Sequence, residues 1–432
     1  MLITNTRIHV NWGPSNPGAS ALEGGERIAS GLAQPKERTM PALDGLRILD
    51  MTQYEAGPSA TQALAWFGAD VVKVEPPRTG DPARGIDNVP RDYFMYWNCN
   101  KRSIAIDLST AEGRDLLLSL VPHFDVFVEN YGPGVVAKLD IDYDVVKAAS
   151  PEIIYASVKG FGLTGPYADR KCFDGVAQAT AGALSTTGYK DGEPLLPGPT
   201  TGDSGTGVQL ALAILAAYVQ KLRTGEGQRI EISMQEAMTY FMRTRVAMMP
   251  GWGERAAPRN GNGAWAVSNL YPTSGDRPND YIMIMAVTPR MFRDLCGAMD
   301  REDLIEDPRF ADNIGRVENA EALKVEIAAW TSRFSKYEVA EKLEAAGVPA
   351  GPVLDTAELM TDPHLVERDF IKSIEHPELG QVPMLGWAPR LSASNVDLEA
   401  APALGAHTEE ILAAELGLDD DAVAALRAGN II

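Results

Sequence analysis

The segment from residue 46 to residue 75 has the pattern of a strand, a helix and a second strand joined by short turns. Residues 46–51 form an apolar run typical of a buried strand, and residues 59–67 are expected to follow as a helix. Residues 70–75 alternate as a strand that ends at Pro76. Two strands joined by one helix within about thirty residues form a βαβ unit, so the chain is expected to build a parallel sheet.

The same pattern continues along the chain. Thr110 is a suitable N-cap for a helix at 110–121, because its hydroxyl can accept a hydrogen bond from the first helical turn. The fold class is therefore α/β with an open parallel sheet, and ligands of such sheets bind beyond the carboxyl ends of the strands. The loops expected to form this rim follow Met51, Glu75, Asp107 and Glu129. Further strands are predicted at 103–107, 125–129, 153–157 and 229–233, and a further helix at 206–222.

The composition of the chain changes twice, which indicates separate regions. Residues 1–39 contain Pro and Gly breaks without a signal-peptide pattern and are read as a flexible leader. A Gly/Asn/Pro-rich loop at 258–263 and new helices after 289 and 319 indicate a second, smaller domain. The predicted regions are a large domain at 40–228, a small domain at 229–346, and a return linker with a C-terminal part completing the large domain at 347–432.

Charge and motif content exclude several classes of function. The net charge of −20 argues against a nucleic-acid partner, and no apolar run of about 18 residues predicts a membrane span. The three cysteines lie far apart and the histidines are scattered, which favours a reducing, cytoplasmic location and gives no support for a metal site. Neither GxGxxG nor GxxxxGK[ST] occurs, so no tightly bound nucleotide cofactor is expected.

The sequence GDSGTG at 202–207 is the strongest local candidate for chemistry. It resembles a serine-protease motif, but the β-barrel pattern and a suitably placed histidine are missing. Alternatively, Asp203 is a nucleophile whose pKa is lowered by the positive end of the following helix, with flanking glycines leaving room for an acyl group. A simple N-cap aspartate is the non-catalytic interpretation.

Basic and glycine-rich loops supply weaker candidates. Lys101 and Arg102 precede a predicted strand and could hold phosphate, although an ordinary solvated turn explains them equally well. Lys138 and Lys171 stand in loops and have the same two interpretations. The loop Gly261-Asn262-Gly263 is either a mobile lid or a plain turn.

Eight segments in the same order as in a known family resemble the class III CoA-transferases, which include formyl-CoA transferase and carnitine CoA-transferase. The resemblance runs from Met40 to the C-terminus. The segments are AGPSATQALAWFGADVVKVE (56–75), NCNKRSIAIDL (98–108), VENYGPGV (128–135), SVKGFGLTGPY (157–167), GDSGTG (202–207), TGEGQRIEISMQEA (224–237), GVPAGPV (347–353) and APALGAHTEEIL (401–412).

The resemblance implies a Rossmann-like large domain, a smaller α/β domain, and an interlocked homodimer. It implies Asp203 as the nucleophile of a CoA-transferase that uses acyl-CoA and a small carboxylic acid, through an aspartyl anhydride and an aspartyl-CoA thioester. The family's glycine loop over the reacting carbonyl corresponds to Gly261, Asn262 and Gly263. The family's CoA-contacting positions correspond to Gln53, Glu55, Ala56, Leu108, Ser109, Asn130, Tyr131, Lys138, Lys171, Cys172, Phe173 and Asp174.

Departures from formyl-CoA transferase bear on the substrate. That enzyme has Gln at the position of Glu55, Trp at that of Ile86 and Arg at that of Pro76, so a larger acid than formate or oxalate is expected, with succinyl-CoA as a candidate donor. The sister racemases need a His where this chain has Phe173, which disfavours α-methylacyl-CoA racemisation. A non-catalytic CoA-binding paralogue remains an alternative, whereas the missing GxSxG motif disfavours an α/β hydrolase.

Overall fold

The computed structural model describes residues 40–85, 92–251, 253–263, 267–377 and 379–432. The predicted leader at 1–39 and the departure at Ile86 lie outside the described residues.

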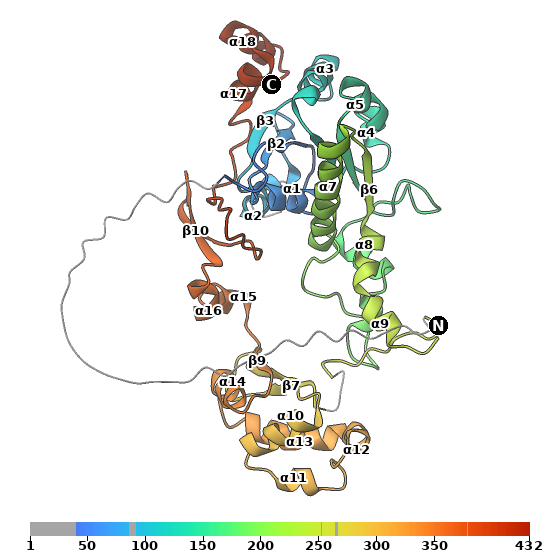
Figure 1. Cartoon of the computed structure of the whole chain (residues 1–432), viewed down its shortest axis with the longest axis vertical. Coiled ribbons are helices and arrows are strands. Elements are labelled where there is room, and N and C mark those ends of the chain that lie inside the picture. Colours follow the sequence, from blue (N-terminus) through green and yellow to red (C-terminus); the bar gives the residue numbers. More distant parts are fainter. Residues whose placement is uncertain (1–39, 86–91, 252, 264–266, 378) are drawn as a thin grey trace, which may run out of the picture. The chain divides into compact units, whose positions relative to one another are not determined.

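Six parallel strands form the main sheet in the order β3-β2-β1-β4-β5-β6 (Figure 1). This is the strand order of the Rossmann fold, in which the crevice lies where the order reverses, between β1 and β4. The predicted parallel α/β sheet is therefore confirmed. The strands are β1 (Arg47–Asp50), β2 (Asp70–Glu75), β3 (Arg102–Ala105), β4 (Val126–Glu129), β5 (Ile154–Lys159) and β6 (Arg229–Ser233).

Helices cover both faces of this sheet because its strand residues are apolar on both sides. On β1, Ile48 packs into the cluster shared with α1 (Ala56–Ala65) and α7 (Ser204–Thr224). The next residue, Leu49, packs into the cluster shared with α3 (Ala111–Leu120), α5 (Tyr143–Ala149) and α17 (Thr408–Leu416). The C-terminal tail thus contributes to the core beside the main sheet.

Helix α1 begins earlier than predicted. Its first turn contains Pro58, which is tolerated there because the first amides of a helix need no carbonyl partner inside it. A Cβ on Gly207 of α7 would lie 1.9 Å from Ser59 Oγ, so the two helices can pack at this distance only with a glycine.

The smaller core is formed around an antiparallel sheet in the order β7-β8-β9. These strands are β7 (Asn269–Pro272), β8 (Tyr281–Ile284) and β9 (Ala350–Pro352), with α10 (Pro289–Ala298), α13 (Ala320–Thr331) and α14 (Lys336–Ala345) among their helices. Two observations differ from the predicted boundaries. Strand β6, assigned to the small domain, pairs with β5 of the main sheet, and β9, assigned to the return linker, pairs with β8.

Helix α7 is long and apolar enough, by length and composition alone, to cross a membrane. The sequence predicts a helix at 206–222 but no apolar run long enough to span a bilayer. One side of α7 contributes Leu210, Ile214 and Ala217 to the core beside the main sheet, while Leu212 and Leu222 are exposed.

The other elements are short. They are α2 (Asp92–Asn98), α4 (Val135–Lys138), α6 (Asp174–Thr180), α8 (Met234–Phe241), α9 (Arg243–Ala247), α11 (Asp303–Glu306), α12 (Asn313–Glu318), α15 (Thr356–Leu359), α16 (Pro363–Glu367), α18 (Asp420–Ala428) and the antiparallel hairpin β10 (Ile371–His376) and β11 (Gly380–Leu385).

Candidate active site

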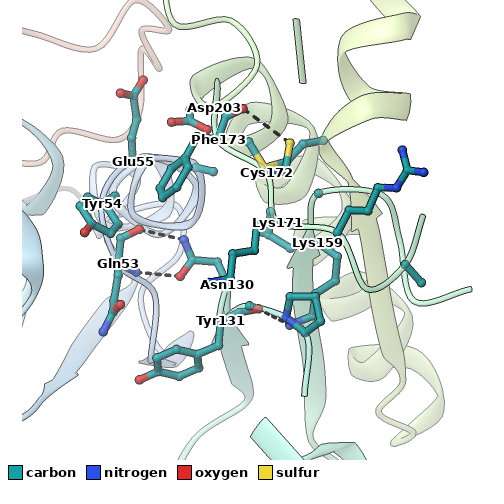
Figure 2. Close-up of a pocket in the computed structure, with 18 residues that line it drawn as sticks. Gln53, Tyr54, Glu55, Asn130, Tyr131, Lys159, Lys171, Cys172, Phe173 and Asp203 are labelled. Carbon is teal, nitrogen blue, oxygen red and sulfur yellow. Dashed lines mark hydrogen bonds between the residues drawn. The ribbon is translucent and has the colours of Figure 1, made fainter. Parts of the chain in front are cut away.

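A pocket opens where β1, β4 and β5 end, at the predicted rim of the sheet (Figure 2). Of the predicted site residues, those that line it are Gln53, Glu55, Ala56, Asn130, Tyr131, Lys171, Cys172, Phe173 and Asp203. These come from the loops after β1 and β4, from the segment before α6, and from the start of α7. The pocket therefore brings together segments that are remote in sequence.

Other predicted residues do not line this pocket. Leu108 and Ser109 follow β3, where Ser109 donates to Asp107, and Lys138 ends the short helix α4. Gly261, Asn262 and Gly263 are also not among the lining residues; the Gly261 amide donates to the carbonyl of Gly188. Asp174 does not line the pocket either, but its carboxylate accepts a hydrogen bond from the backbone amide of Asp203, which does.

The loop after β1 is held by hydrogen bonds on both sides. Asn130 accepts from the Gln53 amide and donates to the Gln53 carbonyl, both at 2.8 Å. The Tyr54 amide donates to Asp81 at 3.2 Å, and Tyr54 has the unusual φ of +60°. Holding a tyrosine in the left-handed backbone conformation costs free energy, which the surrounding contacts must offset. The loop is thus fixed in one conformation at the pocket's edge.

Buried charges lie directly beneath this loop. Lys73 Nζ is 2.8 Å from Asp81 Oδ2 and donates to the Thr52 carbonyl at 2.6 Å. Lys101 Nζ is 3.0 Å from Asp50 Oδ2, and both side chains are fully buried. Burial lowers the pKa of Lys101 to about 8. The suggested phosphate-binding or solvated role of Lys101 is therefore wrong, since the side chain is committed to this internal network.

Asp203 immediately precedes α7, as predicted, but its carboxylate does not cap the helix. The amides of Gly202 and Asp203 donate instead to Asp174 Oδ1, at 2.8 and 3.2 Å. Burial, with the nearby charges of Glu55 and Asp174, raises the pKa of Asp203 to about 7. The predicted lowering of this pKa by the helix dipole is wrong, because desolvation and two like charges outweigh it.

The glycines beside Asp203 have a structural explanation that the sequence did not suggest. A Cβ on Gly202 would lie 2.7 Å from the Asp174 carbonyl oxygen, and one on Gly205 would lie 2.8 Å from the Phe241 ring. These glycines therefore allow the chain around Asp203 to pack closely.

Glu55 and Asp174 are both held by hydrogen-bond donors. Glu55, 2% exposed, accepts from the Tyr93 hydroxyl at 2.8 Å and from the Thr200 hydroxyl. Burial raises the pKa of Glu55, while these two hydroxyls oppose the rise. Asp174 accepts from the Gln178 side chain at 2.8 Å, in addition to the two backbone amides.

The cations around the pocket differ in availability. Lys159 ends β5 and is bound to Glu129 Oε2 at 2.8 Å and to the Tyr131 carbonyl at 2.7 Å. Arg170 stacks over Tyr167, and Lys171 is exposed. Sequence reasoning missed Lys159, although a lysine at the end of a buried strand was a usable signal. Also missed were the lining residues Tyr54, Gly132, Pro133, Val158, Gly160, Ala168, Arg170 and Met234.

No group of three or more His, Cys, Asp or Glu suited to holding a metal ion occurs in the described part of the chain. The pocket instead offers a carboxylate beside two others, under a rim with exposed cations. Such a site can perform covalent chemistry at an acyl group.

Comparison with known proteins gives a consistent answer. The model of CoA-transferase family III matches residues 43–408. The chain belongs to this family. It is 40% identical over 414 residues to a formyl-CoA:oxalate CoA-transferase of Streptomyces avermitilis, covering 90% of this chain and 99% of that protein. A protein of the same name from Streptomyces coelicolor is also 40% identical, over 91% of this chain and all of its own length.

Two solved structures share this fold. A CaiB/BaiF family protein from Brucella suis superposes with a TM-score of 0.78 at 33% identity, covering 87% of this chain and 99% of that chain. A hypothetical protein from Mycobacterium tuberculosis has a TM-score of 0.76 at 28% identity, covering 87% and 100%. As a member of CoA-transferase family III, the chain is an enzyme that transfers CoA and uses CoA thioesters as substrates.

Proposed function

We propose that this enzyme moves CoA from an acyl-CoA to a carboxylic acid with Asp203 as the covalent nucleophile. The observation that carries the proposal is the contrast among three neighbouring carboxylates. Glu55 and Asp174 are held by hydroxyl and amide donors, whereas Asp203 receives no hydrogen bond on its carboxylate within the described residues and lines the pocket. Asp203 is therefore the carboxylate available to attack.

The proposed reaction conserves the thioester's free energy through two kinds of covalent intermediate. The Asp203 carboxylate attacks the thioester carbonyl and the C–S bond breaks. CoA departs as its thiolate, and the donor's acyl group stays on Asp203 as a mixed anhydride. The thiolate then attacks the Asp203 carbonyl, which releases the donor's carboxylate and leaves an aspartyl-CoA thioester. The acceptor carboxylate repeats these two steps in reverse order and departs as the new acyl-CoA, regenerating Asp203. Excluding water from the pocket protects the anhydride.

The pocket rim suits the polar part of CoA. Lys171 and Arg170 are candidates for its phosphates, while the loop at Gln53 and Ala56 and the pair Asn130 and Tyr131 would contact the chain that carries the thiol. CoA is an extended molecule, so Leu108, Ser109 and Lys138 remain proposed contacts outside the pocket. The glycine loop at 261–263 remains a proposed cover of the reacting carbonyl. No tightly bound cofactor is proposed.

The proposed acid pair differs from that named for the Streptomyces relatives. Glu55 places a negative charge close to Asp203, which would repel the second carboxylate of a compact dianion such as oxalate. A longer acid can keep its distal group away from Glu55. Succinyl-CoA is therefore our proposed donor, with a larger carboxylic acid as acceptor.

Two further proposals concern the assembly and location of the enzyme. An interlocked homodimer would cover exposed apolar side chains of α7, among them Leu212 and Leu222; a monomer in light scattering would contradict it. The three cysteines Cys99, Cys172 and Cys296 are all free thiols, which supports a reducing, cytoplasmic location.

Trapping with hydroxylamine tests the nucleophile and the donor together. The enzyme is incubated with succinyl-CoA or with formyl-CoA, quenched with hydroxylamine, and measured by intact mass and peptide mapping. We expect a hydroxamate on the peptide that holds Asp203, in larger yield with succinyl-CoA than with formyl-CoA. The hydroxamate should be absent from Asp203→Ala and retained in the control Asp276→Ala, which changes a residue in an exposed loop.

Failure of this experiment has two distinct meanings. The absence of an adduct with every acyl-CoA would contradict the covalent mechanism and favour a racemase or a non-catalytic CoA-binding protein. An equal adduct with formyl-CoA, together with efficient transfer to oxalate, would contradict the proposed substrate alone.

A further inference from the structure

Glu55 occupies a position that the CoA-contact role does not fully explain. It is nearly inaccessible, and its two carboxylate oxygens accept from different elements. Tyr93 of α2 donates to one oxygen and Thr200 donates to the other. A carboxylate with two hydroxyl donors is stabilised in its ionised form, so these hydrogen bonds oppose the cost of burying the charge.

Thr200 also connects Glu55 to the nucleophile. Its carbonyl accepts from the amide of Asp203 at 3.2 Å and from that of Ser204 at 2.9 Å. Glu55 is the residue immediately before α1, and α1 packs against α7. The hydrogen bond between Thr200 and Glu55 therefore ties the start of α7 to the start of α1, and holds the glutamate's charge at a fixed place relative to Asp203.

We propose that Glu55, held by Tyr93 and Thr200, is a positioning residue whose fixed negative charge makes Asp203 a more basic and more nucleophilic carboxylate. The charge would act most strongly on the free carboxylate. Acylation of Asp203 removes one negative charge from the group of three, so repulsion is relieved as the anhydride forms. This inference rests on the proposed role of Asp203 and adds to it a residue that sets its reactivity.

The other groups around Asp203 point in the same direction. Asp174 adds a second negative charge from the start of α6, and burial with the charges of Asp203 and Asp174 raises the pKa of the Cys172 thiol to about 11, which leaves the thiol neutral. Burial, followed by the charge of Glu55, raises the pKa of Tyr93, which therefore keeps its proton and remains a donor.

The cations nearby do not cancel these charges. Lys159 is bound to Glu129, Arg170 stacks on Tyr167, and Lys171 is exposed to solvent. Glu55 and Asp174 therefore act on Asp203 with little compensation, and burial together with these two charges raises the pKa of Asp203 to about 7.

The test compares the dependence of kcat/KM on pH in the wild type and in Glu55→Gln. The amide keeps the size of the side chain and can still exchange hydrogen bonds with both hydroxyls, but it removes the charge. We expect the acidic limb of the wild-type profile to lie near pH 7. In Glu55→Gln it should move down by roughly one pH unit, with a several-fold lower plateau. Glu321→Gln, an exposed change of the same charge, should leave the profile unmoved.

Tyr93→Phe supplies an independent check should Glu55→Gln fold poorly. Loss of one hydroxyl donor makes Glu55 easier to protonate, so the limb should shift in the same direction by a smaller amount. In the double variant the tyrosine change should add no further shift, because it acts through Glu55.

Two outcomes would overturn the inference. An unchanged acidic limb in Glu55→Gln, with or without lower activity, would show that Glu55 does not set the basicity of the nucleophile. A shift produced by Tyr93→Phe even in the Glu55→Gln background would show that the tyrosine acts directly. Hydroxylamine trapping at Asp203 in the same samples shows separately whether the proposed function holds.

Discussion

Asp203 shows how the surroundings of one residue determine its acidity. The sequence placed it before an apolar helix and so predicted a lowered pKa, but the fold buries it beside Glu55 and Asp174 and raises the pKa to about 7. Glu55 and Thr200 lie 145 residues apart in sequence and are joined by a hydrogen bond. Local sequence could not show this convergence, whereas the position of Asp203 before its helix could be predicted from the apolar run that follows it.

The raised pKa of Asp203 predicts a dependence of stability on pH. In the unfolded chain an aspartate titrates near pH ~4. The folded state therefore binds the proton more tightly, and the resulting cost to stability is absent below about pH 4, grows toward pH 7 and is complete above it.

Asp203→Asn should remove that cost. We expect the free energy of unfolding to rise by on the order of 1–2 kcal/mol at pH ~8.5 and to change little at pH ~4. Urea unfolding at the two pH values measures the effect, with Asp276→Asn as the exposed control. A gain that is equal at both pH values would contradict a raised pKa in the folded enzyme.

The loop after β1 depends on charges that lie on neighbouring elements. Lys73 is on β2, Asp81 follows β2, and together they hold the backbone of Thr52 and Tyr54. Strand β2 itself was predictable from its alternating pattern. The buried lysine was not, because an alternating strand with one lysine also fits an exposed position.

Lys73→Met tests this support. Removing one partner of a buried ion pair leaves Asp81 uncompensated, so we expect a loss of about 3–5 kcal/mol in the free energy of unfolding and a raised KM for acyl-CoA. The double variant Lys73→Met/Asp81→Asn should recover part of the stability. Arg427→Met, which breaks an ion pair exposed on both sides, should cost at most about 1 kcal/mol in the same denaturation experiment. Equal losses in the two single variants would contradict a supporting role for Lys73.

At the scale of the whole chain, the sequence predicted where the strands occur and that a second core is present. It predicted less well where the boundaries between the regions of the chain lie. Strand β6 was expected at 229–233 and is found there, but its partner β5 shows that it completes the main sheet. The segment that contains β9 was likewise predicted as a short return linker, but its pairing with β8 was not predicted. Alternation reveals that a strand exists, but its neighbour depends on contacts between distant residues.

The central claim, a covalent cycle through Asp203, is tested most directly by following oxygen during complete turnover. The enzyme is supplied with an acyl-CoA and with an acceptor acid whose two carboxylate oxygens are ¹⁸O. The mass of the peptide that contains Asp203 is then measured by mass spectrometry. When CoA thiolate attacks the acceptor's side of the anhydride, the bridging oxygen remains on Asp203. We therefore predict that this peptide gains ¹⁸O during the first few turnovers, up to the two oxygens of the Asp203 carboxylate. Formation of the new acyl-CoA with no ¹⁸O in that peptide would contradict the account.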